Sequence, residues 1–558
     1  MDLKSRREFL KLGFASLPAV AFAKAPDAAL SQNNSSAMAG FRTPGTLDRF
    51  IDPLPVPSRL APTEARISGD FYRVRMLESR RQLHSQLPPT RFWGYEGQFP
   101  GPTFDAMRGR PIEVEWENRL PEEHIFPVDR HIHGAMPPAP DVRTVPHLHG
   151  SRTSSLSDGL PEKWFTPGNS VRFHYPNNQR AATLWYHDHA LGITRLNVYA
   201  GLSGFYLLRD GQEAALHLPS GAYEIPLSLQ DRTLDDNGQL VYAPTQEGGI
   251  SLPQGVWGPQ SFGSLPLLNG AIYPYLDVEP RLYRFRVLNA SNSRFYNLYF
   301  NLARSPSDIP SLVTFHQIGS DGGLLAKSVA LEKLLMAPAE RADLIVDFAP
   351  LAGKTITLMN DAMSPYPGWN LFHAIFPPLY ELMQFHVRLP LSRSAGEFHM
   401  PVPVPLQRLD PAQSVRTRDF VLTERMNTKG QSLGMFINGK GYADPITEQT
   451  KLGTMEMWRF INITDDAHPM HVHLVQFQIL ARQGFDYGAF LQGNLRFVGV
   501  SRPPAANEAG WKDTAIVYPK EVLIILLRFE EFTGKYVYHC HVAEHEDNDM
   551  MRPYEITP

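Results

Sequence analysis

The architecture of this 558-residue chain follows from the run Ile112-Glu113-Val114-Glu115-Trp116-Glu117-Asn118, which is preceded by Gly101-Pro102-Thr103 and whose pattern occurs three times. The second copy leads from Asn269-Gly270 to Tyr283-Arg284-Phe285-Arg286-Val287-Leu288-Asn289, and the third from Asn438-Gly439 to Met457-Trp458-Arg459-Phe460-Ile461-Asn462. The closing asparagines are 171 and 173 residues apart, a spacing typical of domains and far longer than a solenoid repeat. The sequence therefore predicts one ancestral domain present three times.

Each copy has the pattern of a β-strand. Its apolar residues alternate over five to eight positions between turn signals, as they do in a half-buried strand. Glycine (41) and proline (49) together make up about 16% of the chain, against a usual sum near 12%, which favours short strands over long helices. We therefore expect an all-β fold of three consecutive Greek-key β-sandwich or barrel domains, at residues 45–210, 211–395 and 396–558.

The composition excludes several classes of protein. A hydrophobic fraction of 43% is too high for a disordered chain. The 53 basic and 57 acidic side chains leave no surplus of positive charge for a nucleic-acid partner. The single cysteine excludes an intrachain disulfide, an all-cysteine zinc site and an ordinary iron–sulfur cluster.

The N-terminus is typical of an export signal. The basic run Ser5-Arg6-Arg7-Glu8-Phe9-Leu10-Lys11 precedes a short apolar stretch, Leu12 to Ala23, and an Ala-x-Ala site. It resembles the twin-arginine signal, which implies the twin-arginine export machinery as a partner and a periplasmic or otherwise exported protein. The alternative is an amphipathic first helix. We expect a signal peptide over 1–25, a flexible leader over 26–44 and no stable membrane insertion.

The histidines are clustered rather than scattered. Twenty histidines placed at random in this length would give about 0.7 His-x-His pairs, whereas five occur. Residues i and i+2 of a strand share a face, so each pair can present two imidazoles to one cavity, as metal ligands require. The pairs are His131/His133, His147/His149, His187/His189, His471/His473 and His539/His541.

The last pair encloses the only cysteine. Strand alternation directs Cys540 to the face opposite His539 and His541, so this short stretch can serve two metal sites. A thiolate, two imidazoles and a weak thioether form the donor set of a blue electron-transfer copper centre. His545 and Met550 follow Cys540 and supply two further donors.

The second imidazole of that donor set has to come from elsewhere in the chain. His468 is available, because Pro469 redirects the chain between it and the next histidine pair. The sequence therefore predicts a blue copper centre built from His468, Cys540, His545 and Met550.

Four motifs in order resemble those of the multicopper oxidases, and within them of the bacterial spore-coat laccases and bilirubin oxidases. They are His147-Leu148-His149-Gly150, Trp185-Tyr186-His187-Asp188-His189, His468-Pro469-Met470-His471-Val472-His473, and His539-Cys540-His541 through Met550. The resemblance covers the chain after residue 45. It implies three cupredoxin-like domains with four copper ions and a trinuclear cluster between the first and third, the middle domain contributing no ligand.

The resemblance also implies which residues bind each copper. Type 1 copper corresponds to the four residues named above. The other implied ligands are His147 and His471 for type 2 copper, and His149, His187, His189, His473, His539 and His541 for the type 3 pair.

One histidine pair imitates the first motif. We assign His131 and His133 to a loop, because only His147 is followed by the Ser157-Asp158-Gly159 and Trp164-Phe165 that the family carries in this region.

Two carboxylates match acidic positions that the family uses near the cluster for proton delivery. Asp158 lies eleven residues after the first ligand, and Glu546 directly follows a type 1 ligand. The alternative for each is a carboxylate that only orients a histidine. We also expect an imidazole edge of His468 or His545 to lie near the surface, where a donor delivers electrons.

The function implied is a copper-dependent oxidase. It couples four one-electron oxidations of phenolic or related organic donors, bilirubin-like tetrapyrroles included, to the reduction of dioxygen to water.

A first alternative is a periplasmic metallo-oxidase of Cu(I), Fe(II) or Mn(II). The 17 methionines are dispersed, which disfavours only the Cu(I) case. A more distant alternative, a cell-division scaffold of the same fold, conflicts with the intact ligand positions. We expect a monomer, and the sequence does not identify the substrate pocket.

Overall fold

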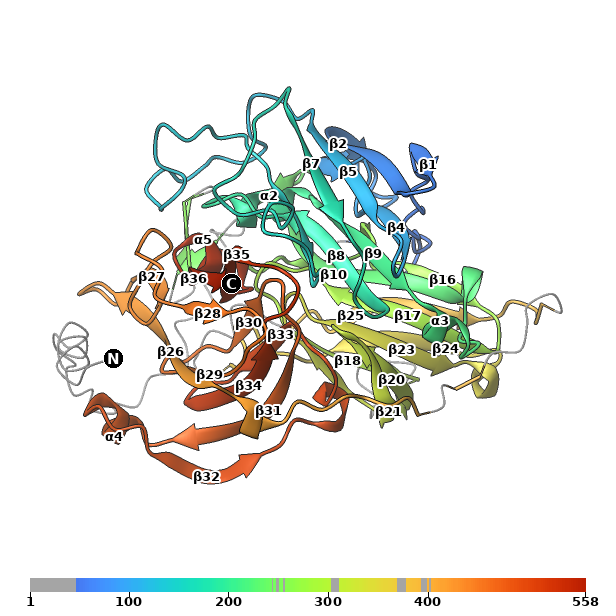
Figure 1. The fold of residues 1–558 in the computed structure, drawn as a ribbon. Helices are drawn as coiled ribbons and strands as arrows, with labels where there is room; N and C mark the ends of the chain where they lie inside the picture. Colours follow the sequence, from blue (N-terminus) through green and yellow to red (C-terminus); the bar gives the residue numbers. More distant parts are fainter. Residues whose placement is uncertain are drawn as a thin grey trace, which may run out of the picture.

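A computed structural model of the chain describes residues 47–242, 244–246, 250–253, 256–302, 311–368, 378–392, 399–400 and 403–558. The predicted signal peptide and leader lie outside these residues. Figure 1 shows three packed bodies of strands, coloured blue to cyan, green to yellow and orange to red. The predicted all-β fold is confirmed. In the described ranges, no helix has the length and apolar character needed to cross a bilayer.

The first body consists of two sheets. Its elements are β1 Glu64–Arg66, β2 Gly69–Arg81, β3 Thr90–Tyr95, β4 Gly101–Met107, β5 Ile112–Asn118, β6 Pro146–His149, β7 Ser170–Tyr175, β8 Ala182–Asp188, α2 Thr194–Ala200, β9 Ser203–Arg209 and α3 Gly211–Ala214. One sheet has the order β1-β2-β5-β7, with β3 paired to β2, and the other β4-β9-β8-β6. Trp116 and Phe104 belong to the core between them.

The middle body is also built from two main sheets. Its strands are β10 Glu224–Leu234, β11 Leu240–Val241, β12 Thr245–Gln246, β13 Ile250–Ser251, β14 Leu265–Leu268, β15 Ala271–Ile272, β16 Tyr275–Val278, β17 Leu282–Asn289, β18 Tyr296–Asn301, β19 Leu312–Val313, β20 Phe315–Ser320, β21 Gly323–Leu331, β22 Leu334–Met336, β23 Arg341–Asp347, β24 Thr355–Asn360 and β25 Glu381–Val387. Short 3₁₀ helices span Gly221–Tyr223 and Ala349–Leu351. The sheet orders are β15-β14-β10-β17-β23-β20-β21 and β16-β25-β24-β18-β19.

The last body carries the C-terminus. Its elements are β26 Arg416–Met426, β27 Ser432–Ile437, β28 Gln449–Lys451, β29 Met455–Asn462, β30 His468–Val472, β31 Phe477–Phe485, α4 Tyr487–Leu491, β32 Phe497–Arg502, β33 Thr514–Val517, β34 Glu521–Arg528, β35 Gly534–Cys540, α5 Ala543–Asp547 and β36 Met551–Thr557, with 3₁₀ helices at Pro411–Gln413 and Ala506–Glu508. The sheet orders are β27-β26-β29-β34-β31-β32 and β28-β36-β35-β30-β33.

The three repeated segments become equivalent strands. β5, β17 and β29 each pair in parallel with an earlier strand (β2, β10 and β26) and antiparallel with a later one (β7, β23 and β34). Burial alternates in β5, but all of β17 except its first residue is buried. The reason is that Arg284 and Arg286 of β17 form buried ion pairs with Glu213, Glu224 and Asp343 where the middle body packs on the first.

The closing asparagine of each repeat is buried and ends its strand in the same way. The side-chain oxygens of Asn118, Asn289 and Asn462 accept a hydrogen bond from the backbone N–H two residues further on, at 3.1, 3.1 and 2.9 Å. This is an Asx-type turn, in which the side chain replaces the next backbone partner of the strand. The repeated asparagine is therefore a strand terminator, and in the last body it stands six residues before His468.

The core of the first body extends past residue 210. Leu234, Leu265 and Tyr273, from the start of the middle body, belong to the same apolar cluster as Trp93 and Phe99. The middle body therefore helps to close the first core, and the domain boundaries at 45–210, 211–395 and 396–558 stay predictions.

Candidate metal centres

Cys540, the last residue of β35, lies between two imidazoles. Its Sγ is 3.6 Å from Nδ1 of His468 and 3.5 Å from Nδ1 of His545, and these two nitrogens are 3.2 Å apart. Met550 is fully buried in the same apolar cluster, and its backbone is hydrogen-bonded to that of Cys540 and of His545. The structure thus brings together the four residues predicted to form a blue copper centre.

The ring of His468 is oriented by the closing asparagine of the third repeat. Thr464 donates its hydroxyl hydrogen to Oδ1 of Asn462 at 2.8 Å, and the same hydroxyl lies 2.7 Å from Nε2 of His468. Because that hydroxyl hydrogen is already used, Nε2 of His468 is the donor and Nδ1 is left to bind a metal.

The prediction that Pro469 redirects the chain between His468 and the His471/His473 pair is wrong. β30 runs unbroken from His468 through Pro469 to Val472. Alternation along this strand places His468 on one face, while His471 and His473 take the other face. No change of chain direction at the proline is needed.

The expected exposure of an imidazole edge is also wrong. His468 and His545 are both 0% exposed. Ala467 packs in an apolar cluster with Phe295 and the half-buried Tyr366, whose rings stack at 4.8 Å. The backbone N–H of Ala467 donates to the carbonyl of Tyr366 at 3.1 Å. A layer of protein therefore separates the two rings from solvent.

The other eight predicted ligands form three buried groups between the first and last bodies. His147 faces His187 across β6 and β8, and His471 faces His539 across β30 and β35, so each strand pair presents imidazoles side by side. Within each group the candidate ligand atoms lie within 4.8 Å of one another. The groups are His149, His187 and His541; His189, His473 and His539; and His147 and His471, with His149 beside them.

Several rings have one nitrogen fixed by an oxygen and the other unpaired. The fixed nitrogens are Nδ1 of His147 on the Asp158 carbonyl (2.6 Å), Nδ1 of His471 on the Asp513 carbonyl (2.8 Å), Nδ1 of His187 on the Asp188 carbonyl (2.9 Å) and Nε2 of His149 on the Asp513 carboxylate (3.1 Å). Among the described residues, the opposite nitrogen of each of these rings has no hydrogen-bond partner, and neither has Nε2 of His541. Buried, unpaired and preoriented nitrogens are what a metal ion requires.

Burial also keeps these rings neutral. It lowers the pKa of His187 and His468 to about 3 and that of His189 to about 4. The same cause holds the pKa values of His147, His149, His471, His473, His541 and His545 well below the ordinary value. Burial raises the pKa of the Cys540 thiol, so metal binding there must release its proton.

Both predicted carboxylates touch the histidine groups. Nδ1 of His473 donates to Oδ2 of Asp158 at 2.8 Å. Glu546 lies 3.3 Å from Nδ1 of His189 and 3.2 Å from Nδ1 of His539. Burial raises the pKa of Asp158 well above its usual range. Burial would also raise that of Glu546, but the neighbouring His189 and His539 rings lower it to about 2.

Helix α5 contacts all three bodies with successive side chains. His545 reaches Cys540, and Glu546 reaches the second histidine group. Asp547 forms a buried ion pair with Arg195 of α2 at 3.0 Å, and Figure 1 shows the two helices side by side. Glu544 accepts hydrogen bonds from Tyr242, Asn292 and Ser293. The helix is therefore held against the first and middle bodies on both sides of His545.

Asp513 is a residue of the site that the sequence analysis missed. Its carbonyl orients His471, its carboxylate orients His149, and Arg341 of the middle body forms an ion pair with it. The only local signal is the acidic residue directly before β33, and nothing in its spacing relates it to a histidine motif.

His131 and His133 lie in a loop, as expected, and outside the histidine groups formed by the described residues. The side chain of His131 is 98% exposed. Nδ1 of His133 lies 3.1 Å from Oδ1 of Asp549, which precedes Met550. This contact joins the first body to the last.

The contact between His133 and Asp549 should make stability depend on pH. The hydrogen bond to Asp549 raises the pKa of His133 above its ordinary 6.5. Its stabilisation is therefore fully present below about pH 6.5 and is lost as the pH rises through the raised value. We expect His133→Gln to lower the free energy of unfolding by about 0.5 kcal/mol at pH 5.5 and to leave it unchanged at pH 9. Denaturant titrations measure this. His131→Gln is the control, and an equal loss at both pH values would contradict the assignment.

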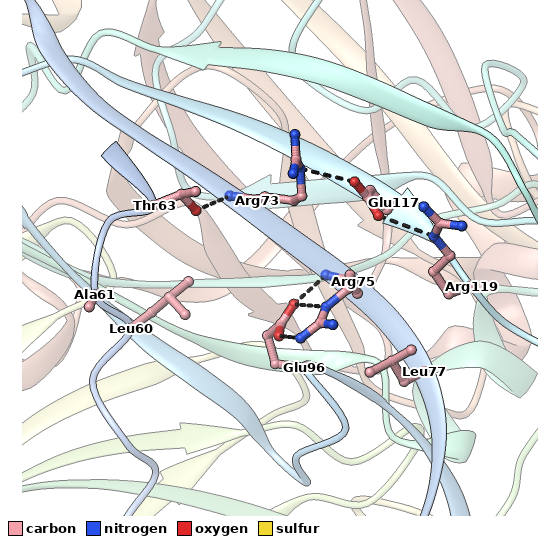
Figure 2. A pocket seen from close by; sticks show the side chains of 9 residues that line it. All are labelled: Leu60, Ala61, Thr63, Arg73, Arg75, Leu77, Glu96, Glu117 and Arg119. Atoms are coloured by element: carbon pink, nitrogen blue, oxygen red, sulfur yellow. Dashed lines mark hydrogen bonds and ion pairs between the residues drawn. The ribbon is translucent and has the colours of Figure 1, made fainter. Parts of the chain in front are cut away.

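A wide depression of about 710 Å³ on the first body lies apart from these groups (Figure 2). Its charged lining is internally paired: Arg75 with Glu96, and both Arg73 and Arg119 with Glu117. Each of the three arginines is thus paired with one of two glutamates, and the lining contains no cysteine or histidine.

A buried thiol between two imidazoles, with the buried Met550 beside them and three further groups of imidazoles, is typical of a copper protein. Multicopper oxidase family models match residues 79–142, 139–213 and 411–558. The chain is 43% identical to a laccase of Bacillus subtilis (strain 168) over 532 residues, 92% of this chain and 99% of that one. It is 40% identical to a laccase of Bacillus stratosphericus, over 91% and 99% of the two chains.

The structural comparison agrees. The crystal structure of a laccase from Pediococcus acidilactici matches with a TM-score of 0.70 at 26% identity, over 92% of this chain and 95% of that one. The chain belongs to the multicopper oxidase family. It is a laccase-like copper oxidoreductase that takes electrons from small-molecule donors and passes them to dioxygen.

Proposed function

We propose that the protein oxidises phenolic and related organic donors one electron at a time and uses four copper ions to reduce dioxygen to water. The position of Cys540 between His539 and His541 carries this proposal. Its side chain belongs to the His468 and His545 group, while its two chain neighbours belong to two different histidine groups. When bound, copper ions at these groups supply one-electron redox chemistry and a site for dioxygen.

The four buried groups support the following ligand assignment. Type 1 copper is assigned to His468, Cys540, His545 and Met550. Type 2 copper is assigned to His147 and His471. The type 3 pair is assigned to His149, His187 and His541 on one side, and to His189, His473 and His539 on the other. The unpaired, neutral ring nitrogens described above support this assignment.

The polypeptide itself connects the donor side to the dioxygen side. His539 and His541 are covalent neighbours of Cys540, and Nδ1 of His539 also donates to the Cys540 carbonyl at 3.1 Å. These residues are almost completely buried. The short covalent and hydrogen-bonded connections favour electron transfer, and the burial of these residues excludes water from the reacting atoms.

Asp158 and Glu546 are assigned to proton supply. Asp158 reaches His473 directly and lies 3.7 Å from Nδ1 of His147, while Glu546 lies between His189 and His539. Each carboxylate therefore touches a ring of the group where dioxygen is reduced, which is the position a proton donor needs.

An aromatic donor is favoured by the surroundings of His468. The apolar cluster of Phe295, Ala467 and Ile516 includes the half-buried aromatic rings of Tyr366 and Tyr518. Phenols pack well against such rings. The alternatives, a metallo-oxidase of Cu(I), Fe(II) or Mn(II) and a cell-division scaffold, are decided by the same assay.

Steady-state kcat/KM values for a phenol, bilirubin, Cu(I) and Fe(II) test this proposal. We expect the phenol to be the best donor, and Tyr366→Ser to lower its kcat/KM about 2- to 10-fold through the lost ring contact, with little change for Fe(II). Tyr380→Ser, at an aromatic residue that is 55% exposed, is the control. Faster oxidation of Cu(I) or Fe(II) than of any organic donor would favour the metallo-oxidase, and a copper-free, inactive protein would favour the scaffold.

Export in the folded state by the twin-arginine machinery and a monomeric state complete the proposal. The first rests on the N-terminal run quoted above, which resembles the twin-arginine signal.

A further inference from the structure

Arg341, the first residue of β23, extends from the middle body to the histidine groups. It is almost completely buried. Its two terminal nitrogens bind the two carboxylate oxygens of Asp513, one at 2.8 Å and the other in a shorter contact. A bidentate arginine–carboxylate pair fixes both position and orientation, which a lysine cannot do.

The rest of the Arg341 guanidinium is equally well fixed. Nε donates to the carbonyl of Thr183, in the strand that carries His187, at 3.0 Å. One terminal nitrogen also donates to the carbonyl of Ala339 at 2.8 Å. The guanidinium therefore contacts the first, middle and last bodies at once.

Asp513 is connected to ligands of two different copper sites. Its carbonyl accepts from Nδ1 of His471 at 2.8 Å, and its carboxylate accepts from Nε2 of His149 at 3.1 Å. These bonds leave Nε2 of His471 and Nδ1 of His149 as the metal-binding nitrogens. One residue thus selects the tautomer and the ring orientation of both.

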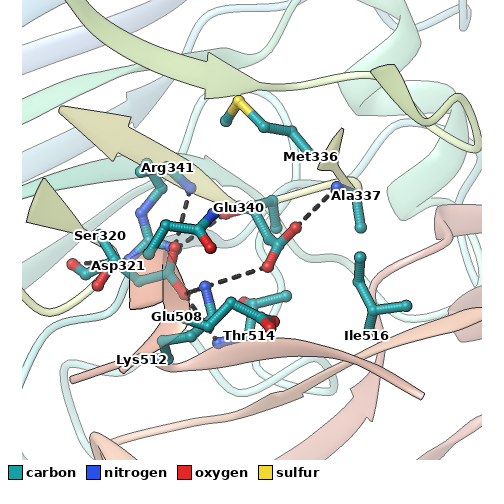
Figure 3. Close-up of polar contacts among 12 residues, drawn as sticks. Ser320, Asp321, Met336, Ala337, Glu340, Arg341, Glu508, Lys512, Thr514 and Ile516 are labelled. Atoms are coloured by element: carbon teal, nitrogen blue, oxygen red, sulfur yellow. Dashed lines mark hydrogen bonds and ion pairs between the residues drawn. The ribbon is translucent and has the colours of Figure 1, made fainter. Parts of the chain in front are cut away.

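A further cluster of ion pairs packs against Arg341 and Asp513. Figure 3 shows Lys512 between Asp321 and Glu340, with Arg341 beside them. The Lys512 ammonium is 2.9 Å from Asp321 and 3.0 Å from Glu340. The backbone N–H of Arg341 donates to Asp321 at 2.9 Å. Each of the buried carboxylates Asp513, Asp321 and Glu340 therefore has a cation within 3.0 Å.

The first ligand motif leaves room for this pair. A Cβ at Gly150 would lie 2.5 Å from a carboxylate oxygen of Asp513 and 2.9 Å from the Arg341 guanidinium, and the backbone there has φ +84°. The glycine that closes His147-Leu148-His149-Gly150 is thus needed for the close approach of Arg341 and Asp513, besides its turn conformation.

We propose that Arg341, acting through Asp513, is the positioning residue by which the middle body, which supplies no ligand, orients His471 of the type 2 site and His149 of the type 3 site. This inference rests on the ligand assignment of the proposed function. It predicts that the pair of Arg341 and Asp513 controls copper retention by the type 2 and type 3 ligands and has no effect on the type 1 ligands.

Copper retention in the holoenzyme tests the role of Arg341. Arg341→Met should lose trinuclear copper to a chelator with about 10- to 100-fold weaker retention, and the electron paramagnetic resonance signal of type 2 copper should change. The blue absorption should stay as in the wild type. Arg341→Lys keeps the positive charge but cannot form the bidentate pair with Asp513. We expect its loss of trinuclear copper to lie between that of the wild type and that of Arg341→Met. Retention is compared at temperatures equally far below each variant's Tm.

Arg286→Met is the matched control. Arg286 is equally buried, also contacts Thr183 and pairs with Glu213 of the first body, but among the described residues it has no contact with a histidine. The Arg286→Met variant should have a lower Tm but an unchanged electron paramagnetic resonance signal of type 2 copper. If Arg341→Met does not fold, Asp513→Asn is measured in the same assay. Retention and signal equal to the wild type, or losses no greater than in Arg286→Met, would overturn the inference. A wild-type protein without copper would instead overturn the proposed function.

Discussion

Replacing Cys540 with serine should abolish the blue absorption and all oxidation of organic donors. Cys540 is the only thiol in the chain, and its Sγ lies within 3.6 Å of the two imidazole nitrogens of its group. A serine hydroxyl is smaller, harder and far less acidic than a thiol, so it cannot supply the thiolate that a blue centre requires. Because His539 and His541 point to other groups, the trinuclear copper should remain bound.

Absorption spectra, copper analysis and turnover with a phenol measure this effect. Met551→Leu is a suitable control, since Met551 is 1% exposed and adjoins Met550 but lies in a different apolar cluster. It should keep both colour and turnover. A Cys540→Ser protein that stays blue contradicts the assignment of the thiol, and one that loses every copper contradicts the independence of the groups.

Asp158→Asn should slow the reduction of dioxygen by about 100-fold while leaving the donor reaction unchanged. An asparagine oxygen can still accept the hydrogen bond from His473, so ring orientation is kept. What is lost is a carboxyl group that holds a proton beside the histidine groups. Within the described residues, Asp158 contacts His473 and His147 and none of the residues assigned to type 1 copper.

Rapid mixing separates the two half-reactions. Bleaching of the blue colour by a phenol reports the donor step, and reoxidation by dioxygen reports the second step. Asp231→Asn, at a buried carboxylate paired with Arg294 outside the histidine groups, controls for loss of a buried charge. If reoxidation keeps its normal rate, Asp158 only orients His473. If both steps slow equally, its role is structural.

The parts of the site that were predictable from sequence are those encoded by local spacing. Period-2 alternation determines the faces of His539, Cys540 and His541 in β35, and it separates His468 from His471 more simply than the turn we inferred at Pro469. The repeated asparagine predicted equivalent strands, because an Asx turn needs only its own residue and the backbone two positions on.

The parts that were not predictable depend on contacts between distant segments. Arg341 and Asp513 are 172 residues apart, and no periodicity relates them. The burial of His468 and His545 depends on packing between bodies, so the expectation of an exposed edge failed. The burial of nearly all of β17 has the same origin, because its arginines are neutralised by Glu213 of the first body together with Glu224 of the middle body. Strand alternation shows which side chains share a face but not what covers that face.

Copper content per chain, measured on the wild type and on Cys540→Ser prepared identically, tests the central claim most directly. Four buried ligand groups predict four copper ions in the blue wild type and three in a colourless variant that keeps the type 2 resonance signal. A wild type with fewer than four copper ions after reconstitution, or a variant that retains all four and the blue colour, would contradict the account.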